Sequence, residues 1–262
     1  MVKHLLRLVA LVYLAFLLVL PVGIVFWRTF EHGPGLVWDA LTQPNALHAI
    51  QLTGIVAIVA VIGNTVFGVG VALLLVRHRF FGRRVLDALL DLPVAVSPVV
   101  VGLALVLVYG RRTAVGGWLG ERGLDIIYAP PGMVIATMFV SLPLVVRAVA
   151  PVLEEIGTEQ EQVAATLGAS ALQTFRRITV PAIRWALVFG VVLTLARGLG
   201  EYGAVAVVSG RIVGQTQTAT LFVEERFGNF DQPAAYAMAF LLAGMAIVVL
   251  LSTNLLRSRE SI

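Results

Sequence analysis

The sequence predicts an all-helical integral membrane protein with about six membrane-spanning helices. Hydrophobic residues make up 59% of the 262 residues and charged residues only 13%, and the mean hydropathy is +0.93. A soluble domain is usually about half apolar and a quarter charged, so the composition favours a helical bundle in a bilayer. The chain has no cysteine and only four scattered histidines, so we expect no disulfide, no iron–sulfur cluster and no metal site.

Six apolar runs are each long enough to cross a bilayer, which takes about 20 residues of helix. The first run is too long for the core of a signal peptide, and no small-residue cleavage site follows it, so we expect a retained helix. The predicted spans are Leu5–Trp27, Leu52–Val76, Leu92–Tyr109, Gly132–Val149, Ile183–Val208 and Ala234–Leu256.

The distribution of basic residues predicts that both termini face the cytoplasm, because Lys and Arg concentrate in cytoplasmic loops. With the N-in/C-in topology, twelve basic residues are cytoplasmic: Lys3, Arg7, Arg77, Arg79, Arg83, Arg84, Arg147, Arg176, Arg177, Arg184, Arg257 and Arg259. Six are on the outer side: Arg28, Arg111, Arg112, Arg122, Arg211 and Arg226. This bias accounts for the basic isoelectric point, so we expect no nucleic-acid partner.

One predicted cytoplasmic segment, residues 154–181, is too polar to cross the membrane and too patterned to be a loose loop. Thr158 and Glu161 have the spacing of a capping box, in which each side chain bonds the other residue's backbone N–H. We therefore expect a helix that begins near Glu159 and runs to Leu167.

A glycine and a serine then predict a second short helix. Gly168 supplies the left-handed residue that ends a helix, and Ser170 can cap a helix over Ala171–Ile178. Pro181 suits the start of the fifth span. Small residues at the turn allow close approach of another protein, yet the same helix pair would also suit a position on lipid headgroups, and both interpretations stay open.

The chain cannot hydrolyse ATP by itself. A Walker A motif needs a lysine that reaches the β- and γ-phosphates, and Lys3 is the only lysine in the sequence. Gly68 and Gly70 lie inside an apolar span, where packing between helices explains them.

Arg197 and Glu201 are charged residues expected within the fifth span, and their separation of four residues places them on one helix face. A charge at mid-bilayer costs about 2.5 kcal/mol or more, so such residues usually face a bundle interior or a water path. They form either an internal ion pair that fixes packing or a pathway and gate element for an anion. Asn64 and Ser97 are further polar candidates for the path, although hydrogen bonds between helices also explain them.

The outer segment around Gly210–Thr220 offers hydroxyls, amides and Arg211, which can hydrogen-bond an oxyanion. The same groups are ordinary in a solvated loop, and this is the simpler interpretation.

Residues Gln162–Ala164, Gly168, Ile178 and Pro181 follow the spacing E-A-A-x3-G-x9-I-x-L-P, and the segment resembles the loop of ABC importer permeases that has this pattern. It departs from the pattern at Gln162, Val163 and Val180. The resemblance implies the type I ABC importer permease fold, one transmembrane domain over residues 1–262, and a coupling-helix loop at 154–181. It places the ATPase-docking residues at Glu161, Gln162, Val163, Ala164, Leu167, Gly168 and Ala169.

Four further stretches resemble the sulfate/thiosulfate permeases, most closely their W-type subunits: Asn64–Gly68, Asp91–Gly102, Ala196–Ala204 and Val208–Gly210. The resemblance implies a multi-pass subunit of the bacterial inner membrane that moves sulfate, and thiosulfate with it, into the cytoplasm by alternating access. The implied partners are a second, T-type permease, an ABC ATPase dimer that binds ATP and Mg, an extracytoplasmic sulfate-binding protein and membrane lipid. This chain itself would bind no cofactor.

Two alternatives stay open. Molybdate and tungstate permeases share the Ala196–Ala204 pattern, and such a permease would form a homodimer. A membrane scaffold or intramembrane enzyme is more remote, because the buried polar residues include no nucleophile–base pair and hence no predicted catalytic residue.

Overall fold

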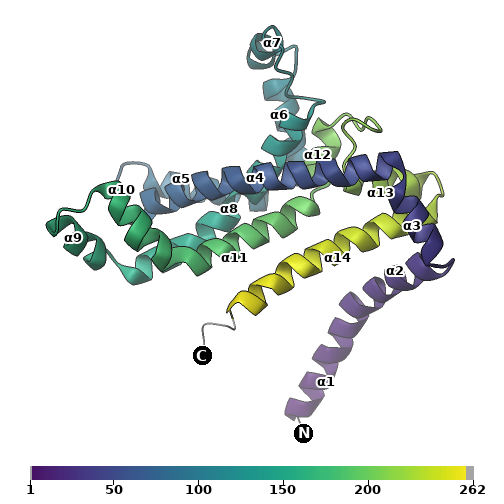
Figure 1. Cartoon of the computed structure of the whole chain (residues 1–262), viewed down its shortest axis with the longest axis horizontal. Coiled ribbons are helices and arrows are strands. Elements are labelled where there is room, and N and C mark those ends of the chain that lie inside the picture. Colours follow the sequence, from purple (N-terminus) through teal and green to yellow (C-terminus); the bar gives the residue numbers. More distant parts are fainter. Residues whose placement is uncertain (1, 258–262) are drawn as a thin grey trace.

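The computed structural model describes residues 2–257, and helices with short connections make up this part of the chain, without a strand (Figure 1). Met1 and residues 258–262, which are the ends of the predicted single domain and include Arg259, lie outside the described residues. The predicted all-helical class is confirmed.

Among residues 2–257, five helices are long and apolar enough to cross a membrane, and one bent helix pair supplies a sixth candidate. This agrees with the prediction of about six spans. The five are Leu6–Phe30, α4 (Pro44–Arg77), α8 (Pro130–Ile156), Ala171–Leu199 and the Gln232–Ser252 part of α14 (Gln232–Arg257). The first begins within α1 (Val2–Leu14) and continues through a π-helical turn η1 (Ala15–Val19) and α2 (Leu20–Phe30).

The third predicted span, Leu92–Tyr109, is wrong as a continuous helix. The chain forms α5 (Arg83–Ala95) and α6 (Pro98–Tyr109), which meet at an angle of 113°. Ser97 precedes a proline, whose ring disfavours helical backbone at that position, and its ψ of 133° is extended. The Ser97–Pro98 pair therefore divides the apolar run.

The fifth predicted span, Ile183–Val208, is also wrong at both ends. At its start, α10 (Ala171–Thr174), a π-helical turn η2 (Phe175–Thr179) and α11 (Val180–Leu199) run on as one helix past Pro181, so no separate helix ends at Ile178. At its other end, α11 stops before Gly200, and α12 (Gly203–Val208) is a new helix. Glycine is a poor helix former, which favours a break here.

Close helix packing explains how the two breaks fit together. A Cβ atom on Gly102 of α6 would lie 2.8 Å from the Ala204 carbonyl oxygen and 2.8 Å from Val207 Cβ of α12. Small residues allow such close approach of helices in membranes. The α6 and α12 helices therefore lie against each other; α12 also packs on α8, while α6 extends away from the long helices (Figure 1).

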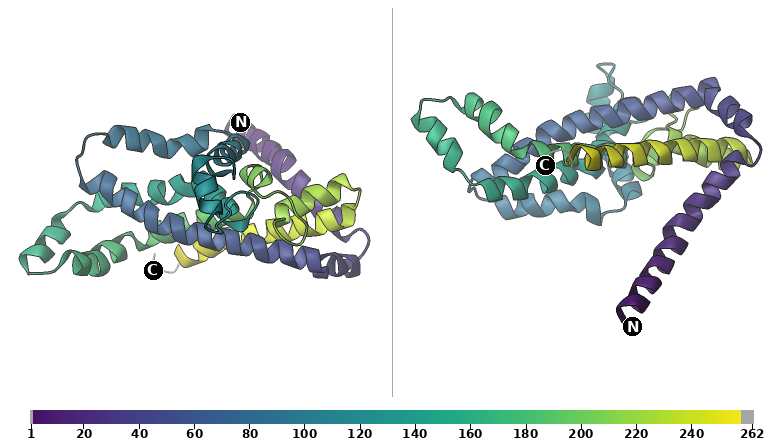
Figure 2. Two further views of the ribbon diagram at one scale, coloured as in Figure 1. Left: turned by 90° about the horizontal axis from the view of Figure 1, so that it is seen from above. Right: turned by 60° about the horizontal axis from the view of Figure 1, so that its bottom comes forward.

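Long helices α4, α8 and α11 pack together, and buried aliphatic side chains along α8 join two of the hydrophobic clusters. The helix α9 (Glu159–Thr166) and α10 lie at one end of the bundle, opposite α3 (Pro34–Thr42) and α13 (Ala219–Gly228) (Figure 1). A third cluster joins α3, α4, α13 and α14. The α1 helix projects away from the bundle (Figure 2), whereas α2 packs against α14, with Phe26 and Phe30 on Phe240.

Candidate functional site

The α9 helix begins at the predicted residue and ends one residue before the predicted Leu167. It covers Glu159–Thr166, and Gly168 follows with a left-handed φ of 84°. The Ala169 N–H then donates to the Ala164 carbonyl at 3.0 Å, as expected when a chain reverses after a left-handed glycine. The first helix and the glycine turn predicted from the sequence are therefore present, and the helix that follows continues into α11.

The predicted capping box at Thr158 and Glu161 is wrong. The Thr158 side chain accepts no backbone N–H and instead accepts from Gln162 Nε2 at 3.0 Å. The Glu161 carboxylate turns inward to Arg77 and Thr179. A charge-assisted hydrogen bond is about twice as strong as a neutral one. The Glu161 carboxylate therefore pairs with Arg77 in place of the backbone N–H at Thr158. A capping box does form at Ser170 and Gln173, which confirms Ser170 as a cap.

The α9–α10 unit presents an apolar surface to its surroundings. Val163 is 58% exposed, Leu167 83% and Leu172 66%. A shallow groove of about 390 Å³ runs between α9 and Ile178. Exposed apolar side chains grouped in this way indicate a contact surface.

The predicted docking residues therefore differ in their accessibility. Gln162, Val163, Leu167 and Gly168 are exposed, and Ala169 is partly exposed. Ala164 is buried beneath the helix, and Glu161 faces the bundle, so these two support the surface from below.

Arg197 and Glu201 form the predicted ion pair, with Arg197 Nη1 and Glu201 Oε2 2.8 Å apart. The Glu201 side chain is only 2% exposed, and its Oε1 accepts the Ala204 N–H at 3.1 Å, so it caps the first turn of α12. The Arg197 side chain is 40% exposed. The carboxylate thus fixes the break between α11 and α12, while the guanidinium reaches the surface beside it.

Ser97 lies in the same region as this pair. It is exposed at the break between α5 and α6, and its neighbour Pro98 packs against Gly203, where an added Cβ would lie 2.9 Å from Pro98 Cβ. Three of the four predicted pathway candidates, Ser97, Arg197 and Glu201, therefore lie at or beside two helix breaks that approach each other through Pro98 and Gly203.

Asn64 is the exception. Its side chain is fully buried between α4 and α8, where Nδ2 donates to the Met138 carbonyl at 3.0 Å and to Ser141 Oγ at 2.9 Å. These bonds confirm the interpretation that hydrogen bonding between helices explains Asn64, and they leave it out of reach of an anion in this conformation.

The sequence analysis missed one charged cluster. Arg147, which the topology places on the cytoplasmic side, lies within α8 and pairs with two carboxylates of α5, Asp87 and Asp91, each at 2.8 Å. The spacing of four residues between the two aspartates, on one helix face, was the available signal. This exposed cluster links α5 to α8 beside the buried contact that Leu90 makes with the α8 side chains.

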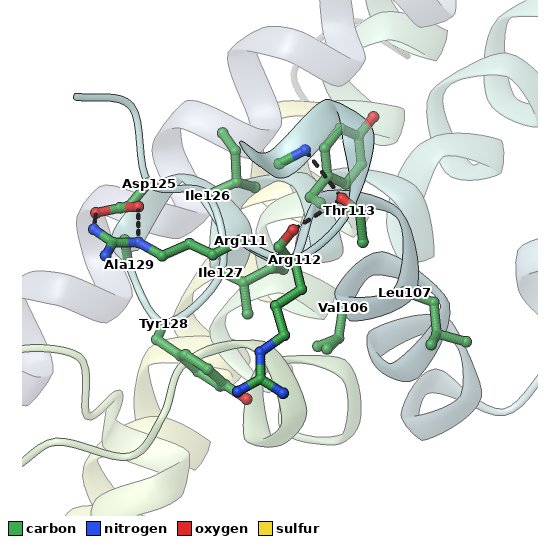
Figure 3. A pocket seen from close by; sticks show the side chains of 13 residues that line it. Val106, Leu107, Arg111, Arg112, Thr113, Asp125, Ile126, Ile127, Tyr128 and Ala129 are labelled. Atoms are coloured by element: carbon green, nitrogen blue, oxygen red, sulfur yellow. Dashed lines mark hydrogen bonds and ion pairs between the residues drawn. The ribbon is translucent and has the colours of Figure 1, made fainter. Parts of the chain in front are cut away.

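A cavity of about 870 Å³ lies between α6, α7 (Ala114–Gly120) and the chain before α8, on the side predicted to be outer (Figure 3). Arg111 pairs with Asp125 on its wall at 2.7 Å, and this hydrogen bond lowers the pKa of Asp125. Arg112 and Tyr128 also line this cavity (Figure 3).

The outer loop residue Arg211 is already paired with Glu224 at 2.9 Å. Thr216, Gln217 and Thr218 are buried. These polar groups therefore serve the loop itself, in agreement with the simpler interpretation of this segment.

The known proteins that this chain resembles are membrane components of transport systems. Residues 64–261 match the family described as "Binding-protein-dependent transport system inner membrane component". A sulfate transport system permease protein CysW of Synechocystis is 47% identical, over 98% of this chain and 94% of that protein. The CysW of Escherichia coli is 46% identical over 94% and 84%, and the CysT of Salmonella typhimurium 39% over 95% and 90%.

A solved structure shares the fold. A bacterial ABC transporter involved in the import of the acidic polysaccharide alginate aligns with a TM-score of 0.81, and the alignment covers 100% of this chain and 96% of that one. The sequence identity is 16%, so this likeness concerns the fold alone.

Proposed function

This chain belongs to the family of binding-protein-dependent transport system inner membrane components, and on that premise we propose that it is the permease subunit of an ATP-driven sulfate importer. The observation on which the proposal rests is the 44–47% identity, over nearly the whole chain, to proteins named as sulfate transport permease CysW. Proteins named CysT are 35–39% identical, which favours the W-type role and a T-type partner over a molybdate or tungstate homodimer.

The energy source would be a separate subunit. The sequence has no lysine beyond Lys3, so the proposed ATPase dimer holds ATP and Mg. Its docking surface is the exposed apolar side of the α9–α10 unit, with Val163 and Leu167 as the main contacts. Nucleotide-driven closure of the ATPase would move this unit and alternate the access of the path.

The proposed path passes the two facing helix breaks. Broken helices at membrane depth are typical of transporter sites. The partly exposed Arg197 guanidinium attracts a dianion, and the buried Glu201 behind it keeps the anion from being held too tightly for release. Ser97 adds a hydroxyl at the facing break.

The remaining partners follow from the same role. We propose that the chain resides in the bacterial inner membrane, that an extracytoplasmic binding protein delivers sulfate or thiosulfate to its outer end, and that the path lies at the contact with the T-type permease. The whole chain would then act as one transmembrane domain.

Co-purification tests this assembly, with Leu167→Glu as the decisive variant. We expect the wild-type chain to bring down a second permease and an ATPase. We expect Leu167→Glu to recover about tenfold less ATPase, because a charge at the centre of an apolar contact costs on the order of 1–2 kcal/mol. Recovery is measured by quantitative immunoblotting of the purified complex.

Leu124→Glu is the matched control, since Leu124 is also an exposed leucine, at 57%, but lies in the segment that follows α7. Equal ATPase recovery with both variants would contradict docking at α9. A complex with one permease type would favour the molybdate alternative, and a chain that purifies alone would favour a scaffold or an enzyme.

A further inference from the structure

One carboxylate joins α9 to three other helices at its end of the bundle. Glu161 Oε1 accepts from Thr179 Oγ1 at 2.9 Å and from Arg77 Nη2 at 3.2 Å, while Oε2 lies 3.2 Å from Arg77 Nε. Arg77, the last residue of α4, also donates from Nη1 to the Leu153 carbonyl of α8 at 3.0 Å. We call Glu161, Arg77 and Thr179 the α9 junction.

This junction is the main attachment of α9 to the bundle. Ala164 is the one residue of α9 that is buried, while its neighbours Val163 and Leu167 point outward. By contrast, Arg77 is held by a well-packed part of the bundle. Leu153, whose carbonyl accepts from Arg77, and the nearby Leu75 of α4 belong to the buried cluster that packs α4, α8 and α11 together. The packed helices α4, α8 and α11 are therefore connected to α9, which buries little of its own surface, through a few polar bonds.

Burial makes the junction stronger than an ordinary surface ion pair. The Arg77 side chain is 12% exposed and that of Glu161 23%, whereas the nearby Arg83–Glu154 pair is 42% and 63% exposed at 4.0 Å. Exposed pairs contribute little because water screens them. In a shielded pair, loss of one partner leaves the other charge uncompensated, so the two groups hold each other in place.

We propose that the α9 junction is the positioning contact that transmits movement of α9 to α4 and α11. This inference rests on the proposed function, in which the ATPase docks on α9. With the junction intact, a displacement of α9 pulls on the ends of α4 and α11. Without the junction, the ATPase can still dock and hydrolyse ATP, but the displacement of α9 no longer moves α4 and α11. Arg77 thus acts through Glu161 and contacts neither sulfate nor the ATPase.

The test is the number of sulfate ions transported per ATP hydrolysed by the whole complex in proteoliposomes. For Arg77→Gln we expect unchanged ATPase co-purification and basal hydrolysis, with the transport ratio lowered about tenfold, a size typical of coupling between sites. Arg77→Lys, which keeps the charge, is expected to restore at least half of the ratio. Arg83→Gln, at the exposed pair, is expected to match the wild type.

A purely structural role predicts a different pattern. If Arg77→Gln acts only by stranding the Glu161 charge, the double variant with Glu161→Gln should recover the ratio, whereas the proposal expects the double variant to stay uncoupled. A normal ratio in Arg77→Gln, or recovery in the double variant, would overturn the proposal.

Two further arms keep the test decisive. If the Arg77→Gln complex does not assemble, Thr179→Val removes one bond and no charge, and its ratio must fall below that of Arg83→Gln. A wild-type complex that lacks an ATPase or imports no sulfate contradicts the proposed function instead, before any variant is compared.

Discussion

Replacement of Arg197 by glutamine is expected to lower sulfate uptake by about tenfold to a hundredfold, while the complex still assembles. The Arg197 side chain is 40% exposed at the two facing helix breaks, so its guanidinium is available to a passing anion. A hydrogen bond to a charged group contributes about 1.5–3 kcal/mol, and each 1.4 kcal/mol is a factor of ten. Uptake of radiolabelled sulfate by cells with matched amounts of the chain measures the effect.

The control concerns Glu201, which the substitution leaves buried without its partner. A stranded buried charge destabilises a protein by about 3–5 kcal/mol, so a loss of uptake could reflect misassembly alone. The double variant Arg197→Gln/Glu201→Gln removes that charge. We expect it to assemble like the wild type and still fail to transport sulfate. Recovered uptake in the double variant would show that the pair only fixes packing.

Gly102→Val is expected to have the largest effect on stability. A Cβ at this position would lie 2.8 Å from the Ala204 carbonyl and 2.8 Å from Val207 Cβ, and two of its three nearest contacts are backbone atoms that cannot rotate away. Overpacking typically costs about 1–3 kcal/mol, and here it would also separate α6 from α12. We expect a lower melting temperature in detergent and little sulfate uptake.

Gly70→Val is the matched control, because it places the same residue in a long helix at a position where an added Cβ meets nothing within 4 Å. It should leave melting temperature and uptake near the wild type. Similar losses for Gly70→Val and Gly102→Val would show that β-branching in a helix, rather than the contact between α6 and α12, causes the defect.

Local sequence patterns predicted the local features of the fold. Gly168 ended α9 as its conformational freedom suggests, and the four-residue spacing of Arg197 and Glu201 gave a real ion pair. The length of the apolar runs predicted continuous helices where the structure has broken ones, because hydropathy carries no information on where the backbone leaves the helical conformation. The Ser97–Pro98 pair and the glycines around Glu201 were local signals that could have divided those runs.

Contacts between distant segments could not be predicted in the same way. Glu161 had a plausible local partner in Thr158. In the folded chain its carboxylate pairs instead with Arg77, which is 84 positions away in the sequence. Arg147 likewise found Asp87 across 60 positions. Such competition is decided by tertiary packing, which local sequence patterns do not show.

Sulfate uptake by whole cells, with and without this chain and with molybdate as competitor, tests the central claim most directly. The account predicts that uptake disappears when the chain is deleted, returns when it is supplied again, and changes little with excess molybdate. Sulfate uptake that survives the deletion, together with a loss of molybdate accumulation, would contradict the choice of anion while leaving the family membership intact.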